Sequence, residues 1–170
     1  SWVVSNGCNS RICSECGKRH ADRWAKRISL KMFDVPHRHL VLGVPDIVWY
    51  ILRGNKQALK TFMDSAILAI NETFKSISHL TIEKGGAIVV LHPYGKDMEF
   101  KVHLHVFMTE GGFSKHKKFI HKKFIKFEVL RKTWQYHVLT ELRNVLPKTE
   151  KYKNLIDACF SKYPNGFYIH

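Results

Sequence analysis

The sequence predicts an α+β fold, in which helices cover one face of a central antiparallel sheet and a small zinc knuckle lies at the N-terminus. Residues 100–108 alternate strictly, so that His103, His105 and two further side chains share the face opposite the apolar one. Strict alternation is typical of a half-buried strand. Residues 46–52 and 59–77 instead carry apolar side chains every three or four positions, which predicts amphipathic helices beside the sheet.

The composition predicts one domain of ordinary size with a small appendage and a polyanionic partner. Of the 170 residues, 45% are hydrophobic, which is enough for a packed core. The net charge of +14 favours nucleic acid first and an anionic membrane surface second. No apolar run reaches the roughly 18 residues of a transmembrane helix, and no signal peptide is visible, so we expect no membrane insertion.

The remaining elements follow from local patterns. Pro36 and Pro45 bracket a predicted first strand, Gly54 ends a short helix, and Pro147 stops a long one. In chain order we predict a basic helix over 18–31, strands over 38–44 and 87–91, a helix over 129–146, a shorter helix over 151–160 and a terminal strand over 167–170.

Three histidines predict a divalent-metal site. Two imidazoles that are two residues apart lie roughly 6.6 Å from each other on one face of a strand. Residues 93–97 form a turn, and the resulting hairpin would bring His92 back beside His103 and His105. Three such side chains can converge on one ion. The alternative is a set of half-exposed histidines that water satisfies.

Three cysteines predict a structural Zn²⁺ site. Cys8, Cys13 and Cys16 are clustered in a chain without a secretion signal, which indicates metal ligands rather than disulfides. The Cys-x2-Cys turn directs both thiolates at one ion. Structural zinc needs four ligands, so either His20 is the fourth or the site is truncated. Free thiols are the remaining alternative.

Lysine-rich segments predict contacts with DNA phosphates. Residues 114–127 contain six lysines and no acid, and we expect a helix there with its aromatic residues on one face. The alternative is a solvated face of a core-packed helix. The predicted DNA-contacting residues are Arg19, Arg23, Lys101, Lys115, Lys117, Lys118, Lys122 and Lys123.

Three stretches together resemble a known family. They are CNSRICSECGKRHADRWA, VPHRHLVLGVPDIVW and LHPYGKDMEFKVHLHVFMTEGG, and the last contains the triplet His103-Leu104-His105. The chain resembles two-tyrosine HUH rolling-circle transposases of the insertion-sequence type, which are related to helitrons and carry an N-terminal zinc-binding domain. The resemblance is strong over 8–112 and looser to residue 170.

The resemblance implies an RRM-like HUH endonuclease fold with a zinc-binding segment over 1–31 and a catalytic domain over 32–170, each truncated. It implies Mg²⁺ or Mn²⁺ on the histidines, a single-strand endonuclease and strand transferase that works through a 5′-phosphotyrosine, and single-stranded or hairpin DNA at transposon ends as the partner. It also implies a prokaryotic cytoplasmic protein that acts at the nucleoid. The family commonly has a histidine at the position of Lys101, which could instead neutralise a phosphate.

The catalytic tyrosine is the weak point of the resemblance. The family carries two tyrosines with three residues between them, and no pair in this chain has that spacing. Tyr168 is a weak candidate, and we expect the nucleophiles beyond His170. A replication initiator of the same fold, or a non-catalytic sheet that binds nucleic acid through Phe107, remain as alternatives. The zinc knuckle favours the transposase.

Overall fold

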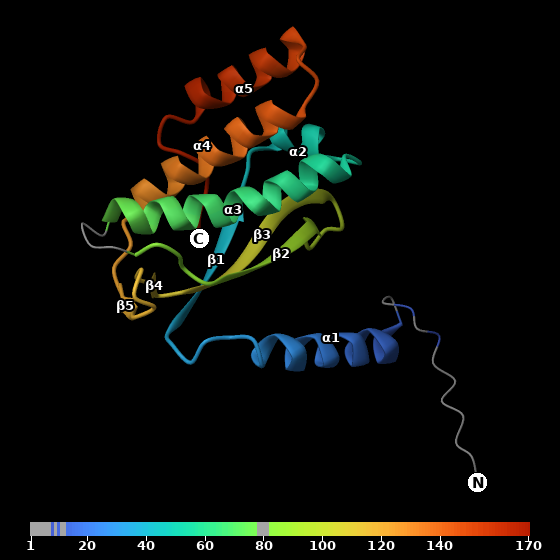
Figure 1. Ribbon diagram of the computed structural model, residues 1–170. Helices are drawn as coiled ribbons and strands as arrows, with labels where there is room; N and C mark the ends of the chain where they lie inside the picture. Colours follow the sequence, from blue (N-terminus) through green and yellow to red (C-terminus); the bar gives the residue numbers. More distant parts are fainter. Residues whose placement is uncertain (1–7, 9, 11–12, 78–81) are drawn as a thin grey trace. The chain divides into compact units, whose positions relative to one another are not determined.

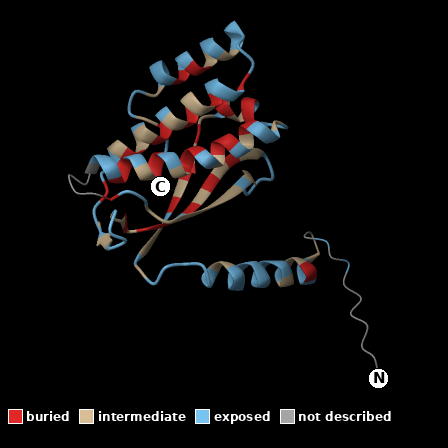
Figure 2. Cartoon of the chain, viewed as in Figure 1, coloured by how far each residue is buried: buried red, intermediate tan, exposed pale blue. Residues whose placement is uncertain are grey.

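The computed structural model describes residues 8, 10, 13–77 and 82–170 (Figure 1). The chain divides into two compact units, Ser1–Asp34 and Val35–His170. The first unit contains helix α1, Ser14–Ser29, and its side chains are mostly exposed (Figure 2). Among the described helices, none is long and apolar enough to cross a membrane.

The second unit is built on an antiparallel sheet. Strand β3, Phe100–Thr109, lies in the centre between β1, His37–Gly43, and β2, Ala87–Tyr94. The C-terminal residues extend this sheet beyond β1, because the N–H of Val41 donates to the oxygen of His170 at 2.7 Å and the N–H of Gly43 donates to the oxygen of Tyr168 at 2.9 Å. Ile169 forms the corresponding bridge with Leu42.

The helices of this unit lie together on one side of the sheet (Figure 1). They are α2, Asp46–Leu52; α3, Lys56–Ile77; α4, Phe127–Val145; and α5, Glu150–Lys162. Side chains Leu104 and Val106 of the central strand are fully buried beneath them, and Trp134 of α4 donates from Nε1 to the oxygen of Gly43 at 2.9 Å. The predicted α+β class, with helices on one face of an antiparallel sheet, is confirmed.

The lysine-rich segment is not the helix that its aromatic spacing predicts. Strand β4, Gly111–Phe113, pairs instead with β5, Phe119–His121, and α4 begins only at Phe127. Gly111 makes the tight approach possible, since its φ is +133° and an added Cβ would lie 2.1 Å from the oxygen of Ile120. We call residues 111–123 the basic hairpin.

A charged network ties the basic hairpin to β1. Arg38 donates from Nε and Nη2 to Oε1 of Glu110 at 3.1 and 2.9 Å, and Nη2 also reaches the oxygen of Lys123 at 2.7 Å. His121 lies 3.2 Å from the other Glu110 oxygen. The bond from His121, and then that from Arg38, holds the pKa of the Glu110 carboxyl below its usual range.

We therefore expect Glu110→Gln to lower the thermal stability of the protein at neutral pH. A carboxyl whose folded-state pKa is depressed stabilises the fold above its unfolded value of about 4.3, and this contribution is lost as the pH falls through the folded-state pKa. The difference in melting temperature between wild type and variant should shrink as the pH falls below about 4.

The matched control is Glu83→Gln, since Glu83 is exposed and forms no ion pair within the described part of the chain. Equal melting temperatures for wild type and Glu110→Gln at pH 7 would contradict the role of this network.

Candidate functional site

Three imidazoles meet on the face of the sheet opposite the helices. The hairpin of β2 and β3 pairs His92 with His103, and His105 follows two residues later on the same face. One ligand nitrogen from each lies within 4.8 Å of the others. The rings of His92 and His105 are 4.0 Å apart between centroids. The buried Leu104 between the pair faces the helices, and so it fixes both histidines outward. We call these three residues the histidine triad.

Hydrogen bonds orient two of the triad rings. Nδ1 of His103 lies 2.8 Å from the backbone oxygen of Lys101, which can only accept, so Nδ1 carries the proton. The lone pair of His103 is therefore on Nε2. Nδ1 of His105 lies 2.9 Å from Nε2 of His39, and one of these two nitrogens carries the shared proton.

Two histidines of the triad, His92 and His105, favour the neutral imidazole. Partial burial, and then the charges of the neighbouring histidines, lower the pKa of both His92 and His105. A neutral imidazole has a free lone pair and can bind a metal ion, whereas a protonated one cannot. The neighbouring histidines thus disfavour protonation of His92 and His105 and leave their lone pairs free to bind a metal cation.

His39 stands beside the triad rather than in it. Its ring stacks between His105 and Phe107, with centroid distances of 5.0 and 4.9 Å. The sequence indicates that His39 could face the site. It does not show the bond to His105, because that contact depends on the register of β1 against β3, in which His39 is opposite Phe107.

Lys101 has carboxylate partners. Its ammonium pairs with Asp97, and with Oε2 of Glu99 at 3.0 Å. These bonds, that to Asp97 first, raise the pKa of Lys101, so its charge is retained but largely compensated. The predicted phosphate contact at this position therefore has two competitors within the chain.

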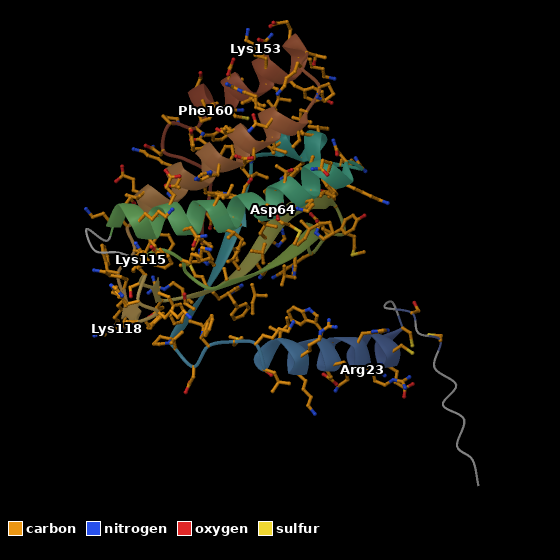
Figure 3. The ribbon with its side chains drawn as sticks, viewed as in Figure 1. Arg23, Asp64, Lys115, Lys118, Lys153 and Phe160 are labelled. Carbon is orange, nitrogen blue, oxygen red and sulfur yellow. The ribbon has the colours of Figure 1, made fainter. Side chains whose placement is uncertain are left out.

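The basic hairpin carries uncompensated charge. Its predicted DNA-contacting residues are Lys115, Lys117, Lys118, Lys122 and Lys123. Four are exposed and Lys122 is half-buried, and none forms an ion pair within the described residues. Lys115 and Lys118 extend outward from the hairpin in Figure 3. In the first unit Arg23 is exposed on α1, and Arg19 approaches Sγ of Cys16 at 3.5 Å.

The cysteines form a second cluster at the start of α1. The Sγ atoms of Cys8, Cys13 and Cys16 lie within 4.8 Å of one another, and those of Cys8 and Cys16 are 3.7 Å apart. The pKa of Cys13 is lowered to about 7. The largest cause is a hydrogen bond from the backbone of Cys16, and the next is a hydrogen bond with the side chain of Cys8. A thiolate near neutral pH is a zinc ligand. His20 does not join this cluster of described ligand atoms.

Comparisons with known proteins cover the segments that carry both clusters. The family model for a transposase zinc-binding domain matches residues 1–44, and a model described as "putative transposase" matches 86–162. The transposase for insertion sequence element IS801 of Pseudomonas savastanoi pv. phaseolicola is 28% identical over 139 residues, which cover 79% of this chain and 32% of that protein. The chain is thus similar to a transposase over 79% of its length.

A second relative is also a transposase by name, and the match again covers only part of its length. A protein named "putative transposase y4qJ" in Sinorhizobium fredii is 27% identical over 116 residues, which are 66% of this chain and 28% of that protein. The chain thus spans about a third of the length of these transposases. No solved structure matches it significantly. The match to a zinc-binding domain supports structural zinc at the cysteine cluster of this chain.

We expect the purified protein to contain about one zinc ion and Cys13→Ala to lose it, because the binding energy of a structural zinc is also folding energy. Elemental analysis of freshly purified protein measures the zinc content. The matched control is Cys159→Ala, since Cys159 is a buried cysteine outside the cluster. Zinc that is absent from wild type, or that persists in Cys13→Ala, would contradict the assignment.

Proposed function

We propose that this chain supplies the metal site and part of the DNA-binding surface of a rolling-circle transposase, which cleaves and rejoins single-stranded or hairpin DNA at transposon ends through a 5′-phosphotyrosine. The observation that carries the proposal is the histidine triad, whose three ligand atoms lie within 4.8 Å on an accessible face of the sheet. The similarity of the chain to transposases supports the same proposal.

The donor set fits a divalent cation. Three imidazoles from two paired strands leave coordination positions for phosphate oxygens and water on the open side of the sheet. Mn²⁺ or Mg²⁺ bound there would polarise the scissile phosphate and stabilise the charge that develops on it. Imidazole suits Mn²⁺ better than Mg²⁺, so we expect tighter binding of Mn²⁺.

The chain's own residues hold and orient the DNA in this proposal. The exposed lysines of the basic hairpin bind phosphates without reading sequence, and Arg23 offers a further cation on α1. Phe107 is 45% exposed beside the triad and offers an apolar ring to an unstacked base. The affinity for DNA should therefore fall steeply with salt concentration.

The nucleophile is proposed to be a tyrosine outside these 170 residues. Attack of its oxygen on phosphorus would form a phosphotyrosine bond and release a 3′-OH. The 3′-OH of a new strand end would later attack the phosphotyrosine, form a phosphodiester and release the tyrosine. Each exchange replaces one phosphodiester with another, so no nucleotide triphosphate is consumed. We therefore expect this chain alone to bind DNA and to cleave it poorly.

The test of the triad is Mn²⁺ binding by His103→Ala combined with His105→Ala. We expect the double variant to lose the tight Mn²⁺ site seen in wild type by isothermal titration calorimetry or electron paramagnetic resonance. The fold should persist, because both side chains leave the sheet on the face opposite the core.

The control is His116→Ala, which removes an exposed histidine from the basic hairpin. Equal Mn²⁺ affinity in wild type and the double variant would refute the site. An affinity for single-stranded DNA that changes neither with Mn²⁺ nor in the double variant would favour the non-catalytic binding module instead.

A separate prediction concerns His39. For His105 to present the lone pair on Nε2, its Nδ1–H must donate to Nε2 of His39. His39→Phe keeps a ring between His105 and Phe107 but removes the acceptor, so we expect Mn²⁺ affinity to fall about 10- to 100-fold. His39→Gln restores an acceptor and should lose less. Equal affinities of the two variants would show that only the ring matters.

A further inference from the structure

The C-terminal strand places an aromatic residue in the same cross-strand row as the triad. Tyr168 is opposite Gly43, Gly43 is opposite His103, and His103 is opposite His92. Ile169 is buried opposite Leu42, so Tyr168 leaves the sheet on the open face. With strands about 4.8 Å apart, the Cα atoms of Tyr168 and His103 are roughly 10 Å apart.

Gly43 leaves the surface of the sheet between Tyr168 and the triad without a side chain. A Cβ added at Gly43 would lie 3.7 Å from Cδ1 of Tyr168 and 3.8 Å from its Cβ. The tyrosine ring therefore borders the backbone of Gly43, which lies between Tyr168 and His103. Gly43 itself presents no side chain to a flat ligand group that lies between Tyr168 and His103.

The tyrosine ring is exposed and yet held in place. Tyr168 is 60% exposed, and its ring lies nearly parallel to that of His170, at 7° and 6.2 Å between centroids. The guanidinium of Arg131, from α4, lies 5.9 Å from the centroid of the Tyr168 ring. A hydrophobic side chain of this size that stays exposed while its neighbours orient it is arranged for contact with a ligand.

A cavity whose lining includes an arginine adjoins the ring. Its volume is about 360 Å³, and its lining includes Gly43, Arg131, Tyr163 and Tyr168. Nε of Arg131 is buried without a hydrogen-bond partner among the described atoms. A buried donor without an acceptor carries a free-energy cost that an anionic oxygen would remove. Base stacking and phosphate binding are thus available side by side.

We infer that Tyr168 and Arg131 form a nucleotide subsite for single-stranded DNA, in which a base stacks on Tyr168 and a phosphate oxygen approaches Arg131. The inference rests on the proposed function, since it places this nucleotide next to the phosphate that the triad would hold. Tyr168 then acts through its ring and not through its hydroxyl, which separates this role from that of a nucleophile.

The test is the affinity of the chain for a short fluorescein-labelled oligothymidine, measured by anisotropy at low salt without added metal. Stacking on one aromatic ring corresponds to a loss of about 5- to 150-fold for Tyr168→Ala. Tyr168→Phe should bind as wild type does. Tyr136→Ala is the matched control, because Tyr136 is 52% exposed but lies on α4.

A second readout separates stacking from a general effect on the fold. An oligonucleotide that carries 2-aminopurine changes its emission when the base stacks, so at saturating protein wild type and Tyr168→Phe should alter the emission and Tyr168→Ala should not. Arg131→Gln should reduce the salt dependence of binding by about one phosphate contact.

The possible failures are distinguishable. Wild-type protein that does not bind the oligonucleotide would overturn the proposed DNA-binding function itself. Wild-type binding together with equal affinity and equal 2-aminopurine emission for Tyr168→Ala and Tyr136→Ala would overturn only the subsite. Loss of binding in Tyr168→Phe would also overturn it, since the ring would then be insufficient.

Discussion

The alternation of side chains along β3 is the constraint on which the rest of this structure depends. Burying Leu104 and its neighbours at every second position commits the strand to the helices on one side. The intervening residues, His103 and His105 among them, must then leave on the other side. A register shift of one residue would exchange the two sets and remove both the core and the site. The stability of the fold and the geometry of the site therefore depend on the same strand register.

The open face of the sheet brings together candidate functional residues from distant parts of the chain. Pairing in the order β2, β3, β1 and then the C-terminal residues aligns His92, His103, Gly43 and Tyr168 in a single row. Antiparallel pairing brings residues from opposite ends of the chain within a few ångströms of one another without any flexible loop in the row. Groups on paired strands are held more precisely than groups on loops, which suits the proposed role of this site in positioning one phosphate.

Charge is arranged in two different ways around this face. Lys101 is compensated by Asp97 and Glu99, whereas the lysines of the basic hairpin have no acidic partners in the described chain. The network of Arg38, Glu110 and His121 fixes the base of that hairpin and leaves its tip charged. The excess positive charge of the whole chain is thus available to a polyanion at a defined place.

Local patterns in the sequence determined the α+β class, the two-stranded hairpin and both clusters of candidate metal ligands. Alternation, turn residues and Cys-x2-Cys spacing act over a few residues, so they can be interpreted without a partner segment. Tertiary structure alone decided the extended form of the lysine-rich segment, where a close backbone approach at Gly111 outweighed the apparent helical spacing. It also decided the bond from His39 to His105 and the alignment of Tyr168 with the triad. Those contacts join residues more than sixty positions apart, and only strand register specifies them.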